Sequence, residues 1–327
     1  MSTKKTAVVL FQLGGPDSLE AVEPFLYNLF CDPDIIDLPG AFLFRKTLAK
    51  VISSRRAEKV RDLYKNIGGS SPILPQTLRQ AKSLEASLKS KGVNAVVHVA
   101  MRYWHPMTEE VLERIRNDGV EEVILLPLYP QYSKVTTGSS VKTWQNAAAK
   151  MKINHLSTKL VESYYDHPMY IAALVENIRQ SINKVPQNER KNIHLVFSAH
   201  GTPIKLVKNG DPYSIQMQKT YEAVIAAGNF DLPHHLCFQS KVGPQRWLEP
   251  SLTQTIKSLA EQKVSHMIIV PIAFVTEHIE TLSEIGIEAR EKAEHLGVTY
   301  FDVMPALIDS PKFISCLTDL VIQQLKN

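Results

Sequence analysis

The sequence predicts an α/β protein made of two similar halves, each with parallel strands joined by helices. Short runs rich in β-branched and aromatic residues alternate along the chain with amphipathic stretches of helical period. That alternation is typical of parallel sheets with helical crossovers. Four β-rich runs fall in each half of the 327 residues, and the length itself agrees with two domains of about 100 to 200 residues each.

The predicted elements follow one another in a regular order. The β-rich runs lie near residues 7–11, 93–100, 122–129, 157–163, 193–199, 235–240, 266–274 and 298–304. The helix-like segments lie near residues 18–30, 76–90, 108–118, 168–184, 214–227, 252–262, 279–296 and 311–325. We expect the boundary between the halves near the polar connection 185–190 or before the helix that precedes it.

Composition and charge exclude several classes of protein. Hydrophobic residues make up 44% and charged residues 21% of the chain, as in ordinary soluble globular proteins. The formal net charge is +4, and no basic run interleaved with aromatic residues occurs, so no nucleic acid partner is expected. No stretch approaches about 18 apolar residues, so no transmembrane span is predicted. The strand-like run 7–11 leaves no room for a separate signal segment before it.

Three cysteines, Cys31, Cys237 and Cys316, stand far apart along the chain. Their spacing predicts neither a disulfide framework nor a thiolate metal site. This use of cysteine fits a reducing cytoplasm.

Polar segments follow the predicted strands in both halves. Ligands of open parallel sheets bind beyond the carboxyl ends of the strands, so chemistry is expected in these segments. In the first half they are residues 14–17, 102–106 and 129–140, and in the second half 198–203, 239–244 and 276–280.

His200 ends a strongly apolar run and stands between the small residues Ala199 and Gly201. Small neighbours leave room for a ligand to approach the imidazole. Taken alone, however, a histidine at a strand end is more often a hydrogen-bonded structural group than a site residue. The role of His200 therefore depends on what lies near it.

Three carboxylates, Glu280, Glu284 and Glu288, follow one another at four-residue spacing. On a regular helix they lie about 6 Å apart along the axis and opposite the apolar stripe that contains Leu282 and Ile285. That geometry favours a solvated face. A row of carboxylates that begins near the carboxyl end of a strand can instead line a wet channel for a hard cation.

Two other stretches have alternative interpretations. The apolar run 38–44 is either part of the core or an apolar lip that grips a flat ligand or a membrane surface. Arg55 and Arg56 after it are either a solvated helix face or partners for a ligand that bears carboxylates. His234 and His235 are adjacent on a predicted strand, where side chains face opposite ways, and this disfavours a shared metal.

Seven motifs occur in a fixed order over almost the whole chain. They occupy residues 13–16, 64–72, 102–106, 128–133, 197–201, 237–248 and 275–282. One such match would be weak, but the ordered set resembles the ferrochelatase family.

The resemblance implies two Rossmann-like domains, each a four-stranded parallel sheet flanked by helices, which face each other across a porphyrin cleft. The first domain is expected at residues 1–165, with the porphyrin lip, joined by the C-terminal helix 311–327. The second is expected at 166–310 and carries His200 and Glu280.

The resemblance also implies roles for individual residues. His200 and Glu280 correspond to the pair that carries the reaction and binds the metal, and Glu284 and Glu288 to an inner acidic path for protons or metal. In the family, the helix near residue 280 contains a π-type turn, which rotates Glu280 away from its place on a regular wheel. The residues that correspond to porphyrin contacts are Leu13, Arg56, Tyr64, Ser71, Arg102, Tyr132, Ser133, Trp247 and His278.

The implied activity is the insertion of Fe²⁺ into protoporphyrin IX to form protohaem, with release of two protons. Ferrous iron and protoporphyrin IX are then substrates, and no prosthetic group is required. The cysteines that hold a C-terminal iron-sulfur cluster in some relatives are absent and the chain stops at Asn327, so no cluster is expected. We expect a cytoplasmic monomer or weak oligomer, with contact to the inner face of the membrane left open.

Two other functions compete with this one. A sister chelatase of the same fold would use coproporphyrin or another tetrapyrrole, or another metal such as cobalt. A non-catalytic porphyrin or haem carrier would keep the aromatic residues of the cleft but would not need His200 and Glu280. Both residues are present, which disfavours the carrier.

Overall fold

The computed structural model describes residues 5–35, 41–153, 156–241 and 245–326. The chain divides into two compact units, which are described separately below. The first unit contains Met1–Ser163 and Leu317–Asn327, and the second contains Tyr164–Cys316. Residues 38–40 of the predicted lip and 242–244 of one motif lie outside the described residues.

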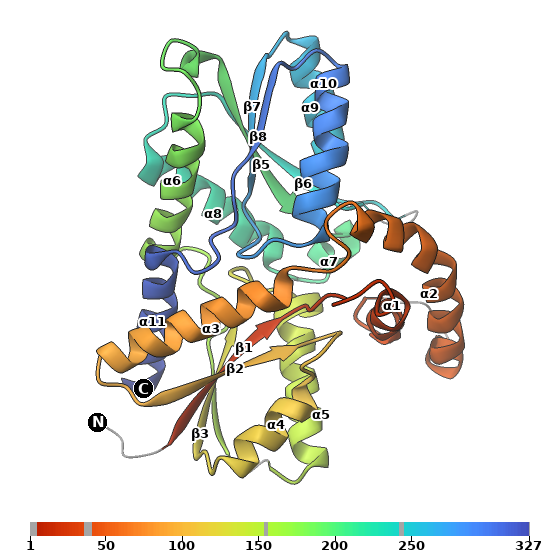
Figure 1. Ribbon diagram of the computed structural model, residues 1–327, viewed down its shortest axis with the longest axis vertical. Helices are drawn as coiled ribbons and strands as arrows, with labels where there is room; N and C mark the ends of the chain where they lie inside the picture. The colour runs from red at the N-terminus through yellow and green to blue at the C-terminus, as the bar shows by residue number, and fades with distance from the viewer. Residues whose placement is uncertain (1–4, 36–40, 154–155, 242–244, 327) are drawn as a thin grey trace. The chain divides into compact units, whose positions relative to one another are not determined.

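The first unit contains a four-stranded parallel sheet in the order β2-β1-β3-β4 (Figure 1). Its strands are β1 (Thr6–Gln12), β2 (Ala95–Met101), β3 (Glu122–Pro127) and β4 (Ser157–Leu160). β1 pairs with β2 on one side and β3 on the other, and all seven of its residues are buried. Such a continuous apolar strand is expected at the centre of a sheet that is covered on both faces.

Helices cover the sheet of the first unit. α4 (Thr108–Asn117) and α5 (Ser139–Lys150) place Ile115 and Trp144 in one core cluster with alternate residues of β1, Val9 and Phe11 among them. α3 (Ile73–Ser90) contacts β2, and α1 (Val22–Cys31) packs against α2 (Ala41–Lys65). A short π-helix, η1 (Lys134–Gly138), leads into α5.

The second unit repeats this topology with the strand order β6-β5-β7-β8. Its strands are β5 (Ile193–His200), β6 (His234–Gln239), β7 (His266–Pro271) and β8 (Tyr300–Val303). In both sheets the first strand along the chain lies between the second and the third. The chain therefore leaves the central strand toward opposite sides, which is the arrangement that opens a crevice at the carboxyl ends of the strands.

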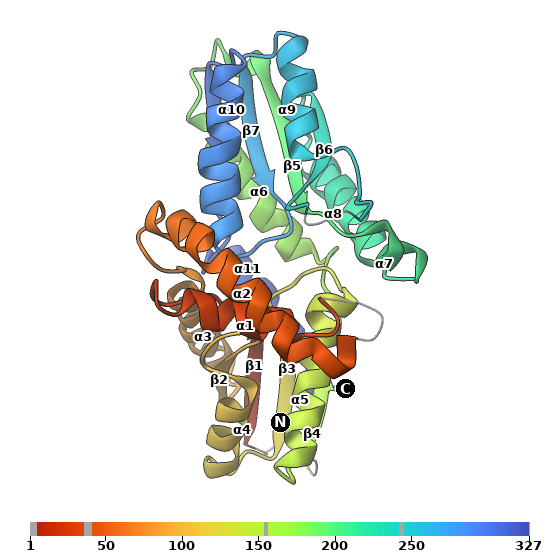
Figure 2. The same ribbon diagram turned by 90° about the vertical axis from the view of Figure 1, so that its right-hand side faces the viewer.

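The helices of the second unit also flank its sheet (Figure 2). The helices of this unit are α6 (Pro168–Asn183), α7 (Ile204–Lys208), α8 (Tyr213–Gly228), α9 (Leu252–Glu261), the π-helix η3 (Glu280–Ala289) and α10 (Arg290–His295), with a 3₁₀ turn at η2 (Arg190–Asn192). Ile256 of α9 and Ile285 of η3 share a core cluster with Val196 and Ile269 of the sheet. α6 contacts α8 and β7. The last helix, α11 (Pro311–Lys326), crosses the division between the units.

The two parallel sheets confirm the predicted α/β class, and a strand lies at each of the eight predicted runs. Three α-helices, α2, α5 and the five-residue α7, lie outside the predicted helical segments. The buried positions of α2 include the small residues Ala49, Ser53 and Ala57, so its inward face is not marked by a row of large apolar side chains. α5 is rich in Ala, which favours a helix without marking a face. No described helix is apolar over a length that would cross a membrane.

Candidate active site

The candidate site lies where the central strand of the second unit ends. His200 is the last residue of β5, Gln239 is the last residue of β6, and Glu280 begins η3, which follows β7. These three elements meet at the switch point of the sheet, where ligands of such folds bind.

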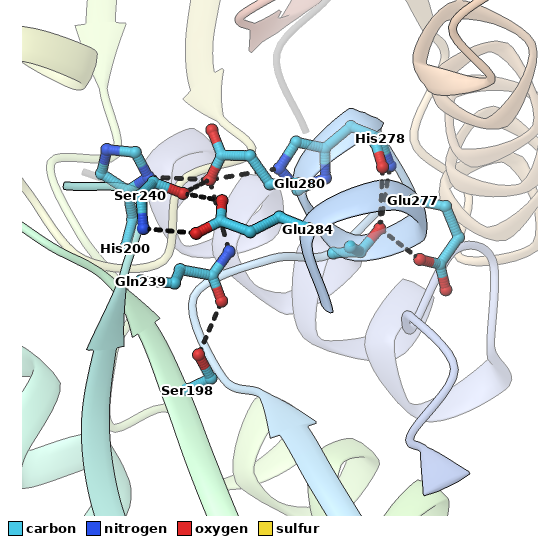
Figure 3. A network of polar contacts seen from close by, with 9 residues as sticks. Ser198, His200, Gln239, Ser240, Glu277, His278, Glu280 and Glu284 are labelled. Atoms are coloured by element: carbon cyan, nitrogen blue, oxygen red, sulfur yellow. Dashed lines mark hydrogen bonds and ion pairs between the residues drawn. The ribbon is translucent and has the colours of Figure 1, made fainter. Parts of the chain in front are cut away.

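His200 and Glu280 form a direct pair although they are 80 residues apart in sequence (Figure 3). The distance between Nδ1 of His200 and Oε2 of Glu280 is 2.8 Å. The side chains are 39% and 23% exposed, so a ligand can reach both. The structure thus brings together the two residues that the sequence nominated as reacting groups.

The π-helical geometry of η3 decides where its carboxylates point. Its hydrogen bonds run from i to i+5, so one turn takes more residues than in an α-helix, and the α-helical wheel does not apply. Glu280 and Glu284 are half-buried in the site, whereas Glu288 is exposed. The expected π-type turn is present. A regular helix would expose all three carboxylates to solvent, but only Glu288 of the three is exposed.

Ser240 binds two carboxylates of η3 at once. Its Oγ lies 2.9 Å from Oε2 of Glu280 and 2.5 Å from Oε2 of Glu284, and its backbone N–H donates to Oε1 of Glu284 over 2.8 Å. The φ angle of Ser240 is +64°, in the left-handed region that a residue with a side chain rarely adopts. Strain of this kind persists where the surrounding structure imposes it, and here two carboxylates hold the residue.

An amide from the end of β6 completes the network. Nε2 of Gln239 donates to Oε2 of Glu280 over 3.4 Å, and Oγ of Ser198 donates to Oε1 of Gln239 over 2.6 Å. Because the amide oxygen of Gln239 accepts from Ser198, the amide nitrogen of Gln239 points toward the Glu280 carboxylate. Oε2 of Glu280 is therefore surrounded by donors from β5 and β6.

The charges in this network oppose the effect of burial. Burial by itself lowers the pKa of His200, but the adjacent Glu280 carboxylate raises it by more, so the pKa lies above the ordinary value. Burial raises the pKa of Glu280, but the charge and hydrogen bond of His200 bring that pKa well below its usual range. Burial also raises the pKa of Glu284, and the nearby charge of Glu280 raises it further. The hydrogen bonds from Ser240 lower this pKa, but by less, so it lies above its ordinary value. The site therefore contains one carboxyl group that holds its proton weakly and one that holds it more strongly.

His278 and Phe274 form the apolar side of the site. Nε2 of His278 is 3.9 Å from Oε2 of Glu280, and burial lowers the pKa of this histidine. The ring of Phe274 lies 4.2 Å from that of His278 and meets the ring of His200 edge to face at 6.4 Å, measured between centroids. A neutral imidazole and an aromatic ring thus flank the charged pair.

Glu277 anchors the start of η3. Its Oε2 accepts from Oγ1 of Thr281 over 2.6 Å, and its Oε1 accepts from the backbone N–H of Ala306 over 2.7 Å. Thr281 in turn accepts from the backbone N–H of His278 over 3.0 Å. These contacts hold the segment that carries both His278 and Glu280.

Trp247, predicted as a porphyrin contact, lies beside the segment that follows His200. It forms an isolated antiparallel bridge with Pro203, and the backbone N–H of Leu248 donates to the carbonyl of Thr202. Trp247 is half-buried. The structure therefore places it in the second unit at the same end of the sheet as the His200–Glu280 pair.

The other predicted porphyrin contacts belong to the first unit and differ in exposure. Arg56 is exposed, with its guanidinium 5.7 Å above the Phe30 ring, whereas Tyr64 is 3% and Ser71 6% exposed. The backbone N–H of Ser71 donates to the carbonyl of Pro16, next to the loop that Leu13 begins.

Ser133 is also buried, and it caps the start of η1 by accepting from the backbone N–H of Val135. Tyr132, before it, is half-buried. The Arg102 guanidinium binds side chains of the same unit, as described below.

Three residues of the site had been assigned no role from the sequence: Ser240, Gln239 and Phe274. Gln239 and Ser240 are the last two residues of the sixth predicted strand, and Phe274 is the last residue of the seventh. Their position at strand ends was the available signal. Their contacts depend on the left-handed turn at Ser240 and on where the expected π-type turn directs the carboxylates, and residue periodicity encodes neither.

Among the described residues, no group of three or more His, Cys, Asp and Glu side chains is arranged to hold a metal ion. His200 and Glu280 provide an imidazole and a carboxylate 2.8 Å apart. An imidazole with a carboxylate suits a first-row divalent metal.

Comparison of the structure with solved proteins finds chelatases. SirB from Bacillus subtilis with Fe³⁺ matches with a TM-score of 0.56 and 12% identity, over 98% of this chain and 95% of that one. CbiX, the terminal enzyme for biosynthesis of siroheme in denitrifying bacteria, matches with a TM-score of 0.52 and 12% identity, over 98% and 99%. The fold is that of the chelatases, and it confirms the predicted pair of Rossmann-like domains.

The sequence comparisons narrow this class to one family. A family model described as Ferrochelatase matches residues 5–325. The chain is 47% identical over 318 residues to "Ferrochelatase" of Aquifex aeolicus, covering 97% of this chain and 98% of the relative. It is 43% identical over 320 residues to "Ferrochelatase" of Geotalea daltonii, with 98% of each chain covered. The chain belongs to the ferrochelatase family of metal-chelating lyases, as the motifs predicted.

The charged His200–Glu280 pair should make stability depend on pH in a defined direction. Because the pKa of His200 is raised in the folded protein, this residue contributes to the free energy of unfolding. The contribution is fully present below the ordinary pKa of 6.5 and is lost as pH rises through the pKa of the folded protein. The lowered pKa of Glu280 gives a contribution that is present above the ordinary value of 4.5 and is lost as pH falls. Glu280→Gln should therefore lower the urea midpoint of unfolding most near pH 6, and by less than about half as much at pH 9. Glu294→Gln, at an exposed residue of α10, is the control, and an equal loss at both pH values would contradict the pairing.

The hydroxyl of Ser240 should matter for metal insertion because it binds both Glu280 and Glu284. Ser240→Ala and Ser240→Gly both remove it, but only glycine also relieves the left-handed backbone. We expect both variants to slow insertion about tenfold, with the glycine variant the more stable of the two. Ser258→Ala on the exposed face of α9 should leave the rate unchanged. A normal rate in the glycine variant would show that the hydroxyl has no part in the reaction.

Proposed function

We propose that this chain is a protoporphyrin ferrochelatase that inserts Fe²⁺ into protoporphyrin IX. The observation that carries the proposal is the His200–Glu280 pair at 2.8 Å, placed at the switch point of a chelatase fold. Relatives with 43 to 47% identity along almost the whole chain have the same family name. Coproporphyrin or another tetrapyrrole as substrate, and a carrier without activity, are not favoured by these comparisons.

The reaction needs a base, a metal ligand and a route for protons. A free-base porphyrin loses two N–H protons as four ring nitrogens bind Fe²⁺, so the protein must accept protons beside the cation. The adjacent Glu280 carboxylate raises the pKa of His200 above its ordinary value, so this imidazole holds a proton that it has accepted more firmly than an isolated histidine would. Glu280 keeps its negative charge beside it and attracts the cation. We assign His200 and Glu280 jointly to metal binding and proton removal.

Glu284 and Glu288 then extend the site outward along η3. Glu284 shares Ser240 with Glu280, and burial raises its pKa, so it can accept a proton near the reacting pair. Glu288 is exposed and can exchange with solvent. We therefore include Glu284 and Glu288 in the proposal, as an acidic path along which protons or metal ions move between the reacting pair and solvent.

Porphyrin binding is proposed for the residues that the family motifs assign. In the second unit Trp247 pairs with Pro203 in the segment that follows His200, and Nε2 of His278 lies 3.9 Å from Oε2 of Glu280. In the first unit Arg56 is exposed and therefore able to meet a propionate. The proposed set from the first unit is Leu13, Arg56, Tyr64, Ser71, Arg102, Tyr132 and Ser133, in which Arg102 contributes through the loops that it holds in place.

We also propose that no iron-sulfur cluster is present, because such clusters are commonly held by four cysteines and this chain contains three. Two of them, Cys237 and Cys316, are buried. Iron is then a substrate only.

We further propose a cytoplasmic monomer or weak oligomer with peripheral contact to the inner face of the membrane. The support is α2, which carries many more Lys and Arg than Asp and Glu. Phe44 and Val51, seven residues apart on one side of that helix, are 69% and 42% exposed. Apolar and basic side chains together suit an anionic lipid surface. Phe44→Glu should release the protein from anionic vesicles in a sedimentation assay, and unchanged binding would contradict the proposal.

His200→Ala should abolish insertion and keep porphyrin binding. The imidazole is the reacting group, whereas the aromatic and apolar contacts to the ring lie elsewhere. The measurement is an anaerobic assay with ferrous iron and protoporphyrin IX that follows the metalloporphyrin spectrum, with a loss of at least about a hundredfold expected. His295→Ala at the exposed end of α10 is the matched control. Full activity in the His200 variant would remove this residue from the mechanism.

A further inference from the structure

Asp32 is a buried carboxylate in the first unit that the reaction does not use. It caps the end of α1, and its side chain is 1% exposed. Oδ2 of Asp32 accepts three side-chain hydrogen bonds: from Nη2 of Arg102 over 2.7 Å, from the hydroxyl of Tyr103 over 2.7 Å and from Oγ of Ser139 over 2.6 Å. Its other oxygen accepts from the backbone N–H of Asp34 over 2.8 Å. A buried charge is tolerated because donors surround it.

The donors come from two different segments at one end of the sheet. Arg102 and Tyr103 follow β2, and Ser139 begins α5 directly after η1. Nε of Arg102 also donates to Oγ of Ser139 over 2.8 Å, so the two segments are bonded to each other as well as to Asp32. One carboxylate thus joins the end of α1, the loop after β2 and the start of α5.

The same contacts extend to the loop after β1. The backbone N–H of Arg102 donates to the carbonyl of Gln12, and that of Tyr103 donates to the carbonyl of Leu13. On the other side, Nδ2 of Asn28 in α1 donates to the carbonyl of Tyr103 over 3.1 Å. The loop that contains Leu13 therefore depends on the position that Asp32 gives to Arg102 and Tyr103.

The guanidinium of Arg102 is committed to this network. Its Nη2 and Nε both bind inside the unit, its side chain is 19% exposed, and it lies 4.7 Å above the Tyr103 ring. A guanidinium bound in this way offers less to a propionate than the exposed Arg56 does.

We propose that Asp32 is a positioning residue for porphyrin binding, acting through Arg102, Tyr103 and Ser139, and that Arg102 serves this network and not a propionate directly. The inference rests on the proposed function, because it concerns the loops assigned to the porphyrin. It adds a residue that none of the sequence motifs singled out.

Asp32→Asn is the primary test. Either orientation of the amide puts an N–H₂ group against a donor, so the loops lose their common anchor while the shape of the side chain is kept. The KM for protoporphyrin IX should rise about tenfold, with kcat changed by less than about threefold, because His200 and Glu280 are untouched. A fall in kcat with KM unchanged would overturn the proposal. Should this variant fail to fold, Ser139→Ala, which removes one donor, should raise KM about threefold, and an unchanged KM there would overturn the proposal equally.

A double-mutant cycle separates positioning from direct contact. The dissociation constant of protoporphyrin IX is measured without iron, by porphyrin fluorescence, for Asp32→Asn, Arg102→Gln and the double variant. If Arg102 acts through Asp32, the double variant should bind about as weakly as Asp32→Asn alone. If the two fold-changes multiply, Arg102 touches the porphyrin independently, and its assignment to the network is wrong.

Glu122→Gln is the matched control. Glu122 is another buried carboxylate of the first unit, with a side chain 7% exposed and 2.9 Å from Nζ of Lys159, but it stands at the start of β3. Its replacement should lower thermal stability and leave KM unchanged. An equal rise in KM would show that the Asp32 effect is general destabilisation. If the unaltered protein forms no metalloporphyrin, the proposed function fails, whereas the iron-free titrations still decide the role of Asp32.

Discussion

The hydrogen bond between His200 and Glu280 is the contact on which the site depends. It joins the end of the central strand to a helix that begins after the neighbouring strand, and it places an imidazole and a carboxylate 2.8 Å apart. Each group shifts the pKa of the other toward its charged form, which opposes the effect of burial. A polar network can be buried to this degree only where its donors and acceptors are matched, and Gln239 and Ser240 supply the matching donors.

Two departures from ordinary backbone geometry make that matching possible. The π-helical turns of η3 bring Glu280 and Glu284 toward the strands, and the left-handed backbone of Ser240 turns its N–H and hydroxyl toward the same carboxylates. Either feature alone would cost stability. The two features occur together because η3 provides the carboxylates and Ser240 provides the N–H and hydroxyl that bind them. Unusual backbone geometry of this kind is concentrated at functional sites.

The first unit uses a carboxylate differently. Asp32 is as thoroughly bonded as Glu280, but its donors are the side chains of Arg102, Tyr103 and Ser139, and it is almost closed to solvent. A carboxylate that accepts four hydrogen bonds and is 1% exposed can hold loops in place but is poorly placed to exchange protons with solvent. Glu280 is 23% exposed and stands beside a base, which suits a reacting group. Similar chemistry thus serves structure in one unit and reaction in the other.

The sequence by itself determined the α/β class, the eight strands and the strand-end segments where the site would lie, because alternating periodicity and turn residues are local properties. Its ordered motifs also predicted the family and nominated His200 and Glu280. Only the tertiary structure decided that Glu288 faces solvent while Glu284 does not, that Ser240 binds two carboxylates, and that Arg102 is held by Asp32. Those outcomes depend on the detailed geometry of a π-helix, on a left-handed residue and on contacts between residues 40 to 70 positions apart, and neither helical nor strand periodicity records any of them.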